Sequence, residues 1–267
     1  MRNFISLVVV LGLMLLGVSA LGASRLDMVK KRQALIAGVK FDAPPFGFVD
    51  RRGRNVGFEI DLARYLAKRL GVKLKLVQVT SKTRILLLIN GHVDLLIATM
   101  THKRERDRVI DFSITYFLDG QKLLVKKNSR IKTTRDLAGR VVATVQGSTS
   151  ERNIAKAQPK VRILTFQEYP MAFLALRQGK ADAVTTDSTI LLGLKKGDRN
   201  YEIVGDFFSS EPYGIGVPEN DSKWRDYINF ALMDWWDSGQ YQRTYAKWFG
   251  PASDYRMDLT FEMEVWP

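Results

Sequence analysis

Two polar side chains occupy equivalent positions in two segments of the chain. Segments 86–99 and 174–187 share one order: an apolar helical stretch, a glycine, an aspartate three residues later and a short apolar strand. Thr99 and Asp187 each stand eight residues beyond their glycine, where the strand ends. Ligands bind beyond the carboxyl ends of the strands in open α/β sheets. We therefore expect this hydroxyl and this carboxylate to face one cleft and to hold a polar ligand.

A third polar stretch, Gly147-Ser148-Thr149, stands where a helix is predicted to begin. Ser148 and Glu151 have the spacing of a capping box, in which each side chain accepts a hydrogen bond from a backbone N–H group of the first turn. N–H groups at a helix N-terminus attract carboxylates. Ser148 and Thr149 are therefore candidates to contact an anionic end of the ligand.

The residues needed for several kinds of enzyme are missing from the sequence. It has two histidines, His92 and His102, no cysteine, and no glycine-rich phosphate loop. Metal-assisted hydrolysis and thiol chemistry lack their usual residues. We expect a binding protein that has no catalytic residues, metal or cofactor.

Alternating strands and helices must position the candidate residues. A first group of segments predicts strands at 35–40, 72–79 and 94–98 and helices at 58–70 and 84–90. A second group predicts strands at 140–145, 161–165 and 182–186 and helices from 148 and over 171–178. Two α/β lobes follow from this order. Two more helices are expected at 222–237 and 241–249, where Trp224, Trp235, Trp236 and Trp248 have the spacing of packing residues.

The N-terminal 23 residues have the composition of a secretory signal peptide. Arg2 precedes an apolar run over 4–16, and small residues follow around 18–23. An uncleaved membrane anchor is the alternative. Because there is no cysteine, disulfides and a lipid-modified N-terminal cysteine are excluded. A periplasmic location fits best.

The chain carries 41 basic and 28 acidic residues, a formal charge of +13. Nucleic acids and anionic membranes are possible partners for such a chain. However, the basic residues are scattered among acidic ones, and no recognition motif accompanies them, so we expect no nucleic-acid partner. A general positive field that attracts small anions is the simpler explanation.

Short motifs along almost the whole mature chain resemble those of the polar amino-acid-binding proteins of ABC importers. In family order they are GVK at 38–40, PF at 45–46, VGFEID at 56–61, TMTHKRER at 99–106, IDFS at 110–113, DLAG at 136–139, GST at 147–149, GKADA at 179–183 with Asp187, YGI at 213–215 and KWFG at 247–250. Each motif alone is weak evidence, but together they are highly specific.

The resemblance implies a type II periplasmic-binding-protein fold, in which each of two lobes has a mixed sheet flanked by helices. It places the lobes at 24–115 with 214–267 and at 121–212, joined by hinges near 116–120 and 211–214. It also implies a monomer that closes on an amino acid and delivers it to the permease of an ABC transporter.

Several site residues are assigned through this resemblance. Arg106 lies where the family has the arginine that binds the α-carboxylate, for which a planar guanidinium is suited. Thr99 and Thr101 are expected to contact the same end of the ligand. Asp187 matches the acidic partner of the α-ammonium group. The neighbouring cations Lys103, Arg104 and Arg108 are expected to be solvated.

Selectivity for the ligand side chain is expected from Lys40 and Arg84, with contributions from Ser81 and Tyr169. Relatives that bind glutamine look to carry an acidic residue at the position of Lys40, and Arg84 resembles an arginine of glutamate- and aspartate-binding members. Two cations would be satisfied by a second ligand carboxylate. The expected ligand is therefore glutamate or aspartate, unless Lys40 and Arg84 pair with Asp42 or Glu59.

Other functions remain open at this point. The ligand could be another polar amino acid such as glutamine. Some relatives are dehydratases that act on prephenate-like acids, and Glu168 is the one candidate here for the general acid that such an enzyme needs. A periplasmic sensor is a further possibility. Phe46 and Phe48 could line the ligand pocket or pack in the core.

Overall fold

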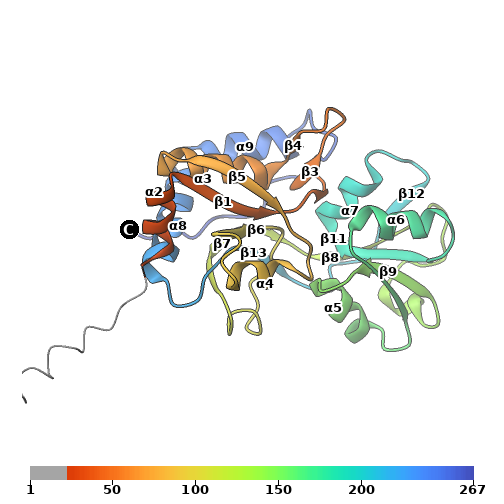
Figure 1. Cartoon of the computed structure of the whole chain (residues 1–267). Helices are drawn as coiled ribbons and strands as arrows, with labels where there is room; N and C mark the ends of the chain where they lie inside the picture. The colour runs from red at the N-terminus through yellow and green to blue at the C-terminus, as the bar shows by residue number, and fades with distance from the viewer. Residues whose placement is uncertain (1–22) are drawn as a thin grey trace, which may run out of the picture.

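The structure, a computed structural model, describes residues 23–267, which form two lobes that lie side by side (Figure 1). The expected signal peptide, apart from Ala23, lies outside the described residues. Within residues 23–267, every helix is too short or too polar to cross a bilayer.

Lobe 1 contains a five-stranded mixed sheet with the order β5-β1-β6-β13-β7. The strands β1, β5 and β6 are parallel, and β13 runs antiparallel to both β6 and β7. Their bounds are β1 (Ala34–Val39), β5 (Lys73–Gln78), β6 (Leu95–Ile97), β7 (Asp111–Asp119) and β13 (Glu211–Val217).

Lobe 2 repeats this arrangement with the order β10-β9-β11-β8-β12. Here β9, β10 and β11 are parallel, and β8 runs antiparallel to β11 and β12. The bounds are β8 (Gln121–Lys126), β9 (Val141–Val145), β10 (Arg162–Phe166), β11 (Ala183–Asp187) and β12 (Tyr201–Val204). The predicted fold of two α/β lobes with mixed sheets is therefore confirmed.

Two connections join the lobes. Strand β7 continues into β8 through Gly120 alone, and residues 205–210 lead from β12 to β13. A Cβ atom at Gly120 would lie 2.5 Å from the ring of Phe207, so the two connections pack directly against each other. The lobe boundaries and hinge positions given by the resemblance stay predictions.

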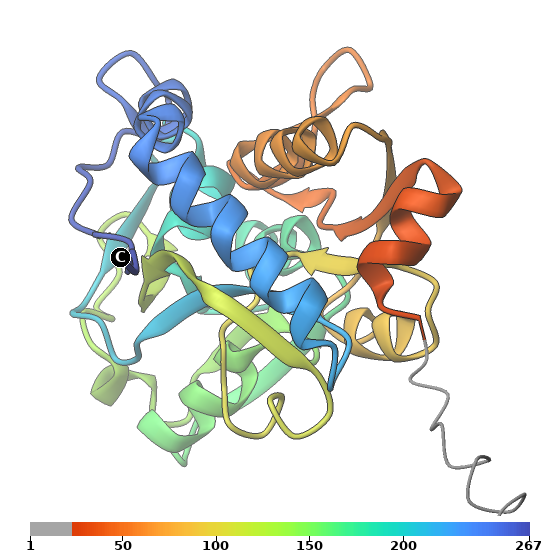
Figure 2. The same ribbon diagram turned by 90° about the vertical axis from the view of Figure 1, so that its left-hand side faces the viewer.

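Helices cover both sheets. Those of lobe 1 are α2 (Arg25–Arg32), α3 (Phe58–Leu70), α4 (Arg84–Ile89), α8 (Ser222–Asp237) and α9 (Gln240–Phe249), and those of lobe 2 are α5 (Thr149–Ala157), α6 (Tyr169–Arg177) and α7 (Ser188–Lys195). The predictions of helices at 58–70 and 222–237 are confirmed, and Gly71 ends α3 in the left-handed conformation with φ 68°. Figure 2 shows α8 lying across lobe 1.

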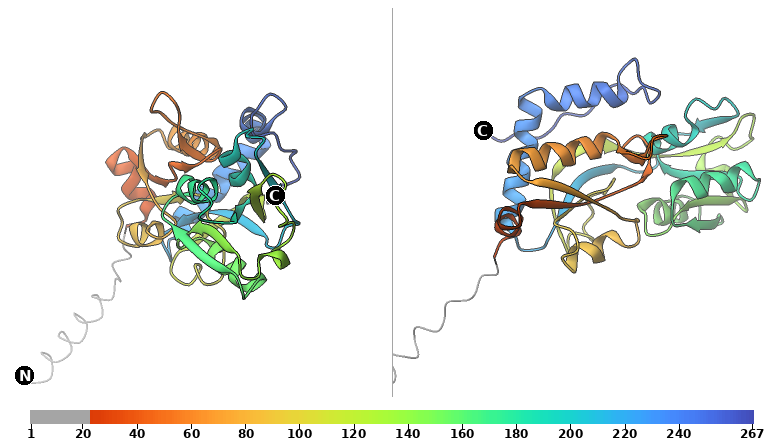
Figure 3. Two further views of the ribbon diagram at one scale, coloured as in Figure 1. Left: turned by 90° about the vertical axis from the view of Figure 1, so that its right-hand side faces the viewer. Right: turned by 45° about the horizontal axis from the view of Figure 1, so that its top comes forward.

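Three small elements at one end of lobe 1 were not predicted. The strands β2 (Asp42–Ala43), β3 (Gly47–Val49) and β4 (Asn55–Val56) form a small antiparallel sheet. It places Asp42 three residues after the end of β1, in contact with Tyr169 of lobe 2. After α9 the chain turns back along lobe 1 to its C-terminus (Figure 3). A short 3₁₀ helix, Thr134–Leu137, lies in lobe 2.

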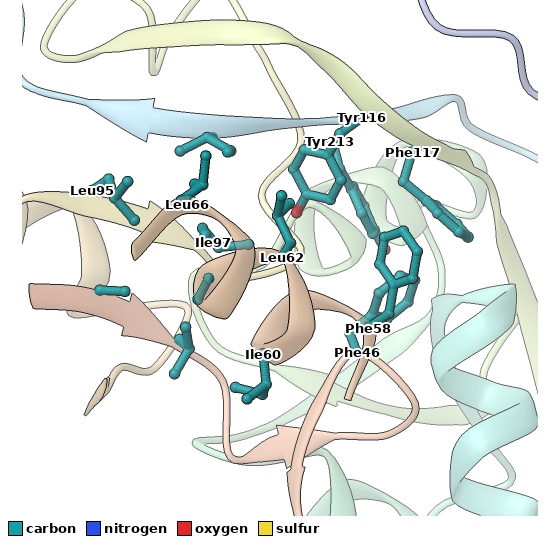
Figure 4. Close-up of a cluster of buried hydrophobic side chains, with 14 of the residues drawn as sticks. Phe46, Phe58, Ile60, Leu62, Leu66, Leu95, Ile97, Tyr116, Phe117 and Tyr213 are labelled. Carbon is teal, nitrogen blue, oxygen red and sulfur yellow. The ribbon is translucent and has the colours of Figure 1, made fainter. Parts of the chain in front are cut away.

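An aromatic cluster forms the core of lobe 1 beside the connections (Figure 4). The ring of Phe46 lies 4.9 Å from that of Phe117 and 5.4 Å from that of Tyr213, centroid to centroid. Phe46 is therefore a core residue, whereas Phe48 is half-buried. Trp224 and Trp235 are buried as well, which confirms their predicted packing role.

Candidate ligand site between the lobes

The ten site residues predicted from the sequence are all buried, with side chains from both lobes. Their exposed fractions lie between 0% and 5%. Lobe 1 contributes Lys40, Ser81, Arg84, Thr99, Thr101 and Arg106, and lobe 2 contributes Ser148, Thr149, Tyr169 and Asp187. By contrast, Arg104 and Arg108 are exposed and Lys103 is half-buried, so Arg106 differs from its basic neighbours as expected.

Lys40 forms an ion pair within its own lobe. Its Nζ atom lies 3.1 Å from Oδ1 of Asp42 and 5.1 Å from the ring centroid of Tyr169 in lobe 2. The backbone N–H of Tyr169 donates to the other Asp42 oxygen at 3.1 Å. Burial lowers the pKa of Lys40, and Asp42 opposes that shift. Asp42 therefore neutralises Lys40 and also joins the two lobes.

Arg84 and Glu59 lie on either side of the backbone at the end of β6. Arg84 donates through one guanidinium nitrogen to the carbonyl oxygens of Ala98 and Thr99, the latter at 3.3 Å. Glu59 accepts from the backbone N–H of Thr99 at 2.6 Å and from the hydroxyl of Tyr116. Burial raises the pKa of Glu59 to about 7 and lowers that of Arg84.

A second network, around Glu211, connects the two lobes. Thr101 Oγ1 donates to Glu211 Oε2 at 2.5 Å, and Thr149 Oγ1, from lobe 2, donates to the same oxygen at 2.8 Å. Arg106 donates to the carbonyl oxygen of Thr101 at 2.9 Å. Burial, followed by the repulsion from Arg84, lowers the pKa of Arg106 to about 9. Arg106 would gain from a carboxylate partner.

Asp187 is the last residue of β11, whereas the sequence predicted it to follow directly after a strand at 182–186. Its carboxylate accepts from Gln121 Nε2 at 3.1 Å and from the hydroxyl of Tyr213. Both donors are uncharged. Burial and then the negative charge of Glu211 raise its pKa well above the usual range. A cation placed at Asp187 would therefore stabilise the ionised form.

The start of α5 differs from the predicted capping box. Ser148 donates its hydroxyl to the carbonyl oxygen of Val145 at 2.6 Å and forms no cap hydrogen bond. Glu151 instead accepts from the backbone N–H of Gly147 at 2.8 Å. The prediction of reciprocal capping by Ser148 and Glu151 is wrong, although the helix begins where expected.

Several buried polar atoms have no hydrogen-bond partner among the described residues. They include the hydroxyl of Ser81, Nε of Arg84, Oε2 of Glu59 and Nζ of Lys40, which has only its ion pair with Asp42. Buried polar groups are normally paired. The lobe 1 side of the site therefore offers both donors and an acceptor.

Glu211, Gln121 and Tyr213 were not predicted as site residues. They lie on β13 and β8, the strands next to the connections, where the sequence shows no pattern that distinguishes a ligand-facing side chain. The resemblance gave the YGI motif at 213–215 and the location of the second crossing, at 211–214, but no role for these side chains. Their partners are far away in sequence, as in the pair Thr101 and Glu211, which are 110 residues apart.

Comparison with known proteins gives a family match over most of the chain. The model of the bacterial extracellular solute-binding proteins, family 3, matches residues 35–251. A glutamine-binding protein of Geobacillus stearothermophilus is 48% identical over 200 residues, which cover 73% of this chain and 76% of the relative. A glutamate/aspartate import solute-binding protein of Salmonella typhimurium is 31% identical over 256 residues, covering 90% and 84%.

A solved structure supports the same assignment. An ancestral arginine-binding protein bound to glutamine has a TM-score of 0.79 and 41% identity, covering 82% of this chain and 99% of that one. The fold, the buried charged residues from both lobes and the family match agree. The chain belongs to family 3 of the bacterial extracellular solute-binding proteins, the amino-acid-binding components of ABC importers.

Proposed function

We propose that this protein captures glutamine between its lobes and delivers it to an ABC permease, after export by the N-terminal signal peptide. The ion pair between Lys40 and Asp42 carries the choice of glutamine over glutamate. The similarity to a glutamine-binding protein, at 48% identity against 31% for a glutamate/aspartate binder, points the same way.

The expectation of an acidic ligand rested on two cations without protein partners, and Lys40 does not meet that condition. The buried cations Lys40, Arg84 and Arg106 are accompanied by four buried carboxylates, those of Asp42, Glu59, Asp187 and Glu211. An acidic ligand would bring one more carboxylate into a set in which carboxylates already outnumber cations, and burying it carries a desolvation cost. Glutamine adds no net charge.

The unpartnered atoms also fit an amide. A glutamine side chain has a carbonyl oxygen that accepts and an amino group that donates, whereas a carboxylate only accepts. Arg84 Nε and the Ser81 hydroxyl would donate to the amide oxygen, and Glu59 Oε2 would accept from the amide nitrogen. In the same proposal Arg106 binds the α-carboxylate and Asp187 binds the α-ammonium group, whose charge keeps Asp187 ionised.

A dehydratase is less well supported. The sequence offered Glu168 as its general acid, and this residue is half-buried at the start of α6, where its side chain accepts a long hydrogen bond of 3.4 Å from Gln78. It therefore lacks the desolvation that would prepare a carboxylic acid for proton transfer. The matched relatives named above are binding proteins.

The test is a ligand panel on refolded, ligand-free protein, read by thermal unfolding and then by calorimetry. The panel contains glutamine, glutamate, aspartate, asparagine, arginine, histidine and prephenate. A ligand at 100 times its Kd stabilises the fold by about 2.7 kcal/mol. We expect glutamine to give the largest shift. A larger shift with glutamate or aspartate would contradict the proposal.

Asp42→Asn tests the role of the ion pair. Removal of the carboxylate leaves Lys40 without its partner, so the preference should move from glutamine towards glutamate by about tenfold. Asp107→Asn, which removes an exposed carboxylate of the same lobe, is the matched control and should leave the preference unchanged. An unchanged preference in Asp42→Asn would show that Asp42 does not set it.

A further inference from the structure

A groove of about 1050 Å³ lies where the β3–β4 hairpin of lobe 1 meets the end of α7 in lobe 2, beside α9. In Figure 1 these elements surround the upper part of the boundary between the lobes. The groove is distinct from the ligand site, because none of the ten candidate ligand residues lines it. Six basic side chains line it: Arg51, Arg52, Arg54, Arg64, Lys196 and Lys247. We call it the basic groove.

The positive charge of the basic groove is only partly neutralised. Asp50 pairs with Arg54 at 2.8 Å, and Asp61 pairs with both Arg64 at 2.8 Å and Lys247 at 2.6 Å. Lys196 lies 3.5 Å from Asp254. Arg51 and Arg52, at the exposed tip of the hairpin, pair with no carboxylate of residues 23–267. Six cations therefore face three carboxylates.

Aromatic side chains form the remaining walls of the groove. Phe48 packs edge-on against Trp248 and Tyr255, with ring centroids 5.9 Å and 6.4 Å apart, and Lys247 lies 5.1 Å from the centroid of Trp248. Arginine, tryptophan and tyrosine are the side chains enriched at the energetic centres of protein–protein interfaces. This composition favours a polypeptide partner over a single small anion.

The groove requires both lobes to be in contact. Gly193 of α7 lies against Pro44 of lobe 1 so closely that a Cβ atom at Gly193 would be 1.9 Å from the Pro44 carbonyl oxygen. Both residues belong to the groove lining, as does Lys196. Separation of the lobes would divide the surface and move Lys196 away from the five cations of lobe 1.

From these observations we propose that the basic groove binds an acidic segment of a partner protein, and that it binds this segment more tightly when the lobes are closed. Charge complementarity identifies the chemistry of the partner, and the aromatic walls supply apolar contact area. Such binding is sensitive to ionic strength, because the arginines at the hairpin tip are exposed.

The first experiment uses a fluorescent deca-glutamate peptide as the probe and measures its anisotropy with the full mature protein. In Arg51→Ala/Arg52→Ala we expect about tenfold weaker peptide binding. Lys126→Ala/Lys127→Ala removes the same charge from an exposed part of lobe 2 and is the matched control. Equal losses in the two variants would overturn the proposal, because they would show attraction by net charge alone.

Two further arms decide the class of partner. A deca-glutamine peptide should not bind at concentrations that saturate with deca-glutamate. A single-stranded oligothymidylate that binds as tightly, with the same dependence on Arg51 and Arg52, would contradict a protein segment as the ligand. Both Arg51→Ala/Arg52→Ala and the control should keep the wild-type Kd for glutamine, which excludes misfolding.

The last arm adds saturating glutamine to the peptide titration and rests on the proposed function. We expect about fivefold tighter peptide binding with glutamine, as reciprocal coupling requires. Calorimetry measures glutamine binding separately. If glutamine binds but peptide affinity does not change, the link to closure is wrong. If glutamine does not bind, the proposed ligand is wrong. In that case the comparison of Arg51→Ala/Arg52→Ala with Lys126→Ala/Lys127→Ala still tests the groove.

Discussion

The two lobes have the same sheet order but contribute different charged groups to the site, because lobe 1 holds the buried cations together with the carboxylates of Asp42 and Glu59. Every buried cation of the described residues belongs to lobe 1, where Lys40, Arg84 and Arg106 bond to carboxylate or carbonyl groups of their own lobe. Lobe 2 contributes Asp187, whose partners are the neutral groups of Gln121 and Tyr213. A zwitterion can therefore bind its carboxylate to lobe 1 and its ammonium to lobe 2, which neither lobe can do alone.

Asp187→Asn should have the largest effect, because it removes the anionic half of this arrangement. We expect glutamine affinity to fall at least about 100-fold, the order expected when one member of a buried charge pair is lost. The ligand-free variant should also unfold at higher temperature at pH 7, since the raised pKa means that the ionised carboxylate destabilises the fold. Calorimetry and thermal unfolding measure both effects.

The matched control is Asp198→Asn, which removes a half-buried carboxylate of lobe 2 between α7 and β12. Glutamine affinity within threefold of the wild type in Asp187→Asn would mean that Asp187 does not bind the ammonium group.

Arg106→Lys tests the side chain that we propose binds the α-carboxylate of the ligand. The charge is kept, but the planar pair of donors is lost, so we expect about thirtyfold weaker binding. Because every amino acid has an α-carboxylate, the loss should be similar for glutamine and for any other ligand that binds in the panel. Arg108→Lys, at an exposed position, should have no effect. Unequal losses among ligands would place Arg106 at the ligand side chain instead.

The pH dependence of the free energy of unfolding tests whether Glu59 of lobe 1 is buried with a raised pKa. With a pKa of about 7 in the fold, Glu59 contributes stability that is complete below its ordinary pKa of 4.5 and is lost as the pH rises through 7. From pH 5.5 to 7.5 the loss amounts to roughly 2 kcal/mol. Denaturant unfolding of the ligand-free protein at several pH values should show a loss that is smaller by this amount in Glu59→Gln than in the wild type, while the raised pKa of Asp187 maintains the remaining slope.

A slope equal in Glu59→Gln and in the wild type would assign the pH effect to another group. The control is Glu202→Gln, which changes a partly exposed carboxylate of lobe 2 that pairs with Lys132 at 2.7 Å.

Gly193→Ala should have the smallest effect. It tests whether close contact between the lobes contributes to glutamine binding. The added Cβ would meet the Pro44 carbonyl oxygen, so closure should be strained and glutamine affinity about fivefold weaker. The ligand-free protein should be slightly more stable, because alanine favours a helix over glycine by roughly 0.5–1 kcal/mol. A variant that loses stability without ligand would instead show that Gly193 is needed within lobe 2.

Local patterns were enough to predict the repeated part of the fold. The strands expected at 94–98 and 182–186 are β6 and β11, and they place Thr99 and Asp187 at the site. Both strands were predictable because apolar periodicity and turn glycines are signals that extend over only a few residues. The partner of Lys40 could not be chosen in this way. Asp42 is held by the backbone of Tyr169, 127 residues later, and this contact exists only once the lobes meet.

The capping box shows a different limit of sequence reasoning. Ser148 and Glu151 have suitable types and spacing, but the left-handed conformation of Gly147, with φ 75°, presents its own N–H to Glu151. Backbone conformation before the helix therefore decided which donor was capped. A pattern of side chains alone does not contain that information.

The position of β13 has a consequence for the order in which the chain folds. The sheet of lobe 2 is built from the continuous stretch 121–204, whereas β13 must enter the lobe 1 sheet between β6 and β7, with Gly216 opposite Leu96 and Phe112. Pairings between residues about 100 positions apart slow folding. We expect lobe 2 to fold first. The sheet of lobe 1 therefore stays incomplete until residue 217 has been made, so lobe 1 can be completed only after the whole of the lobe 2 sheet is available.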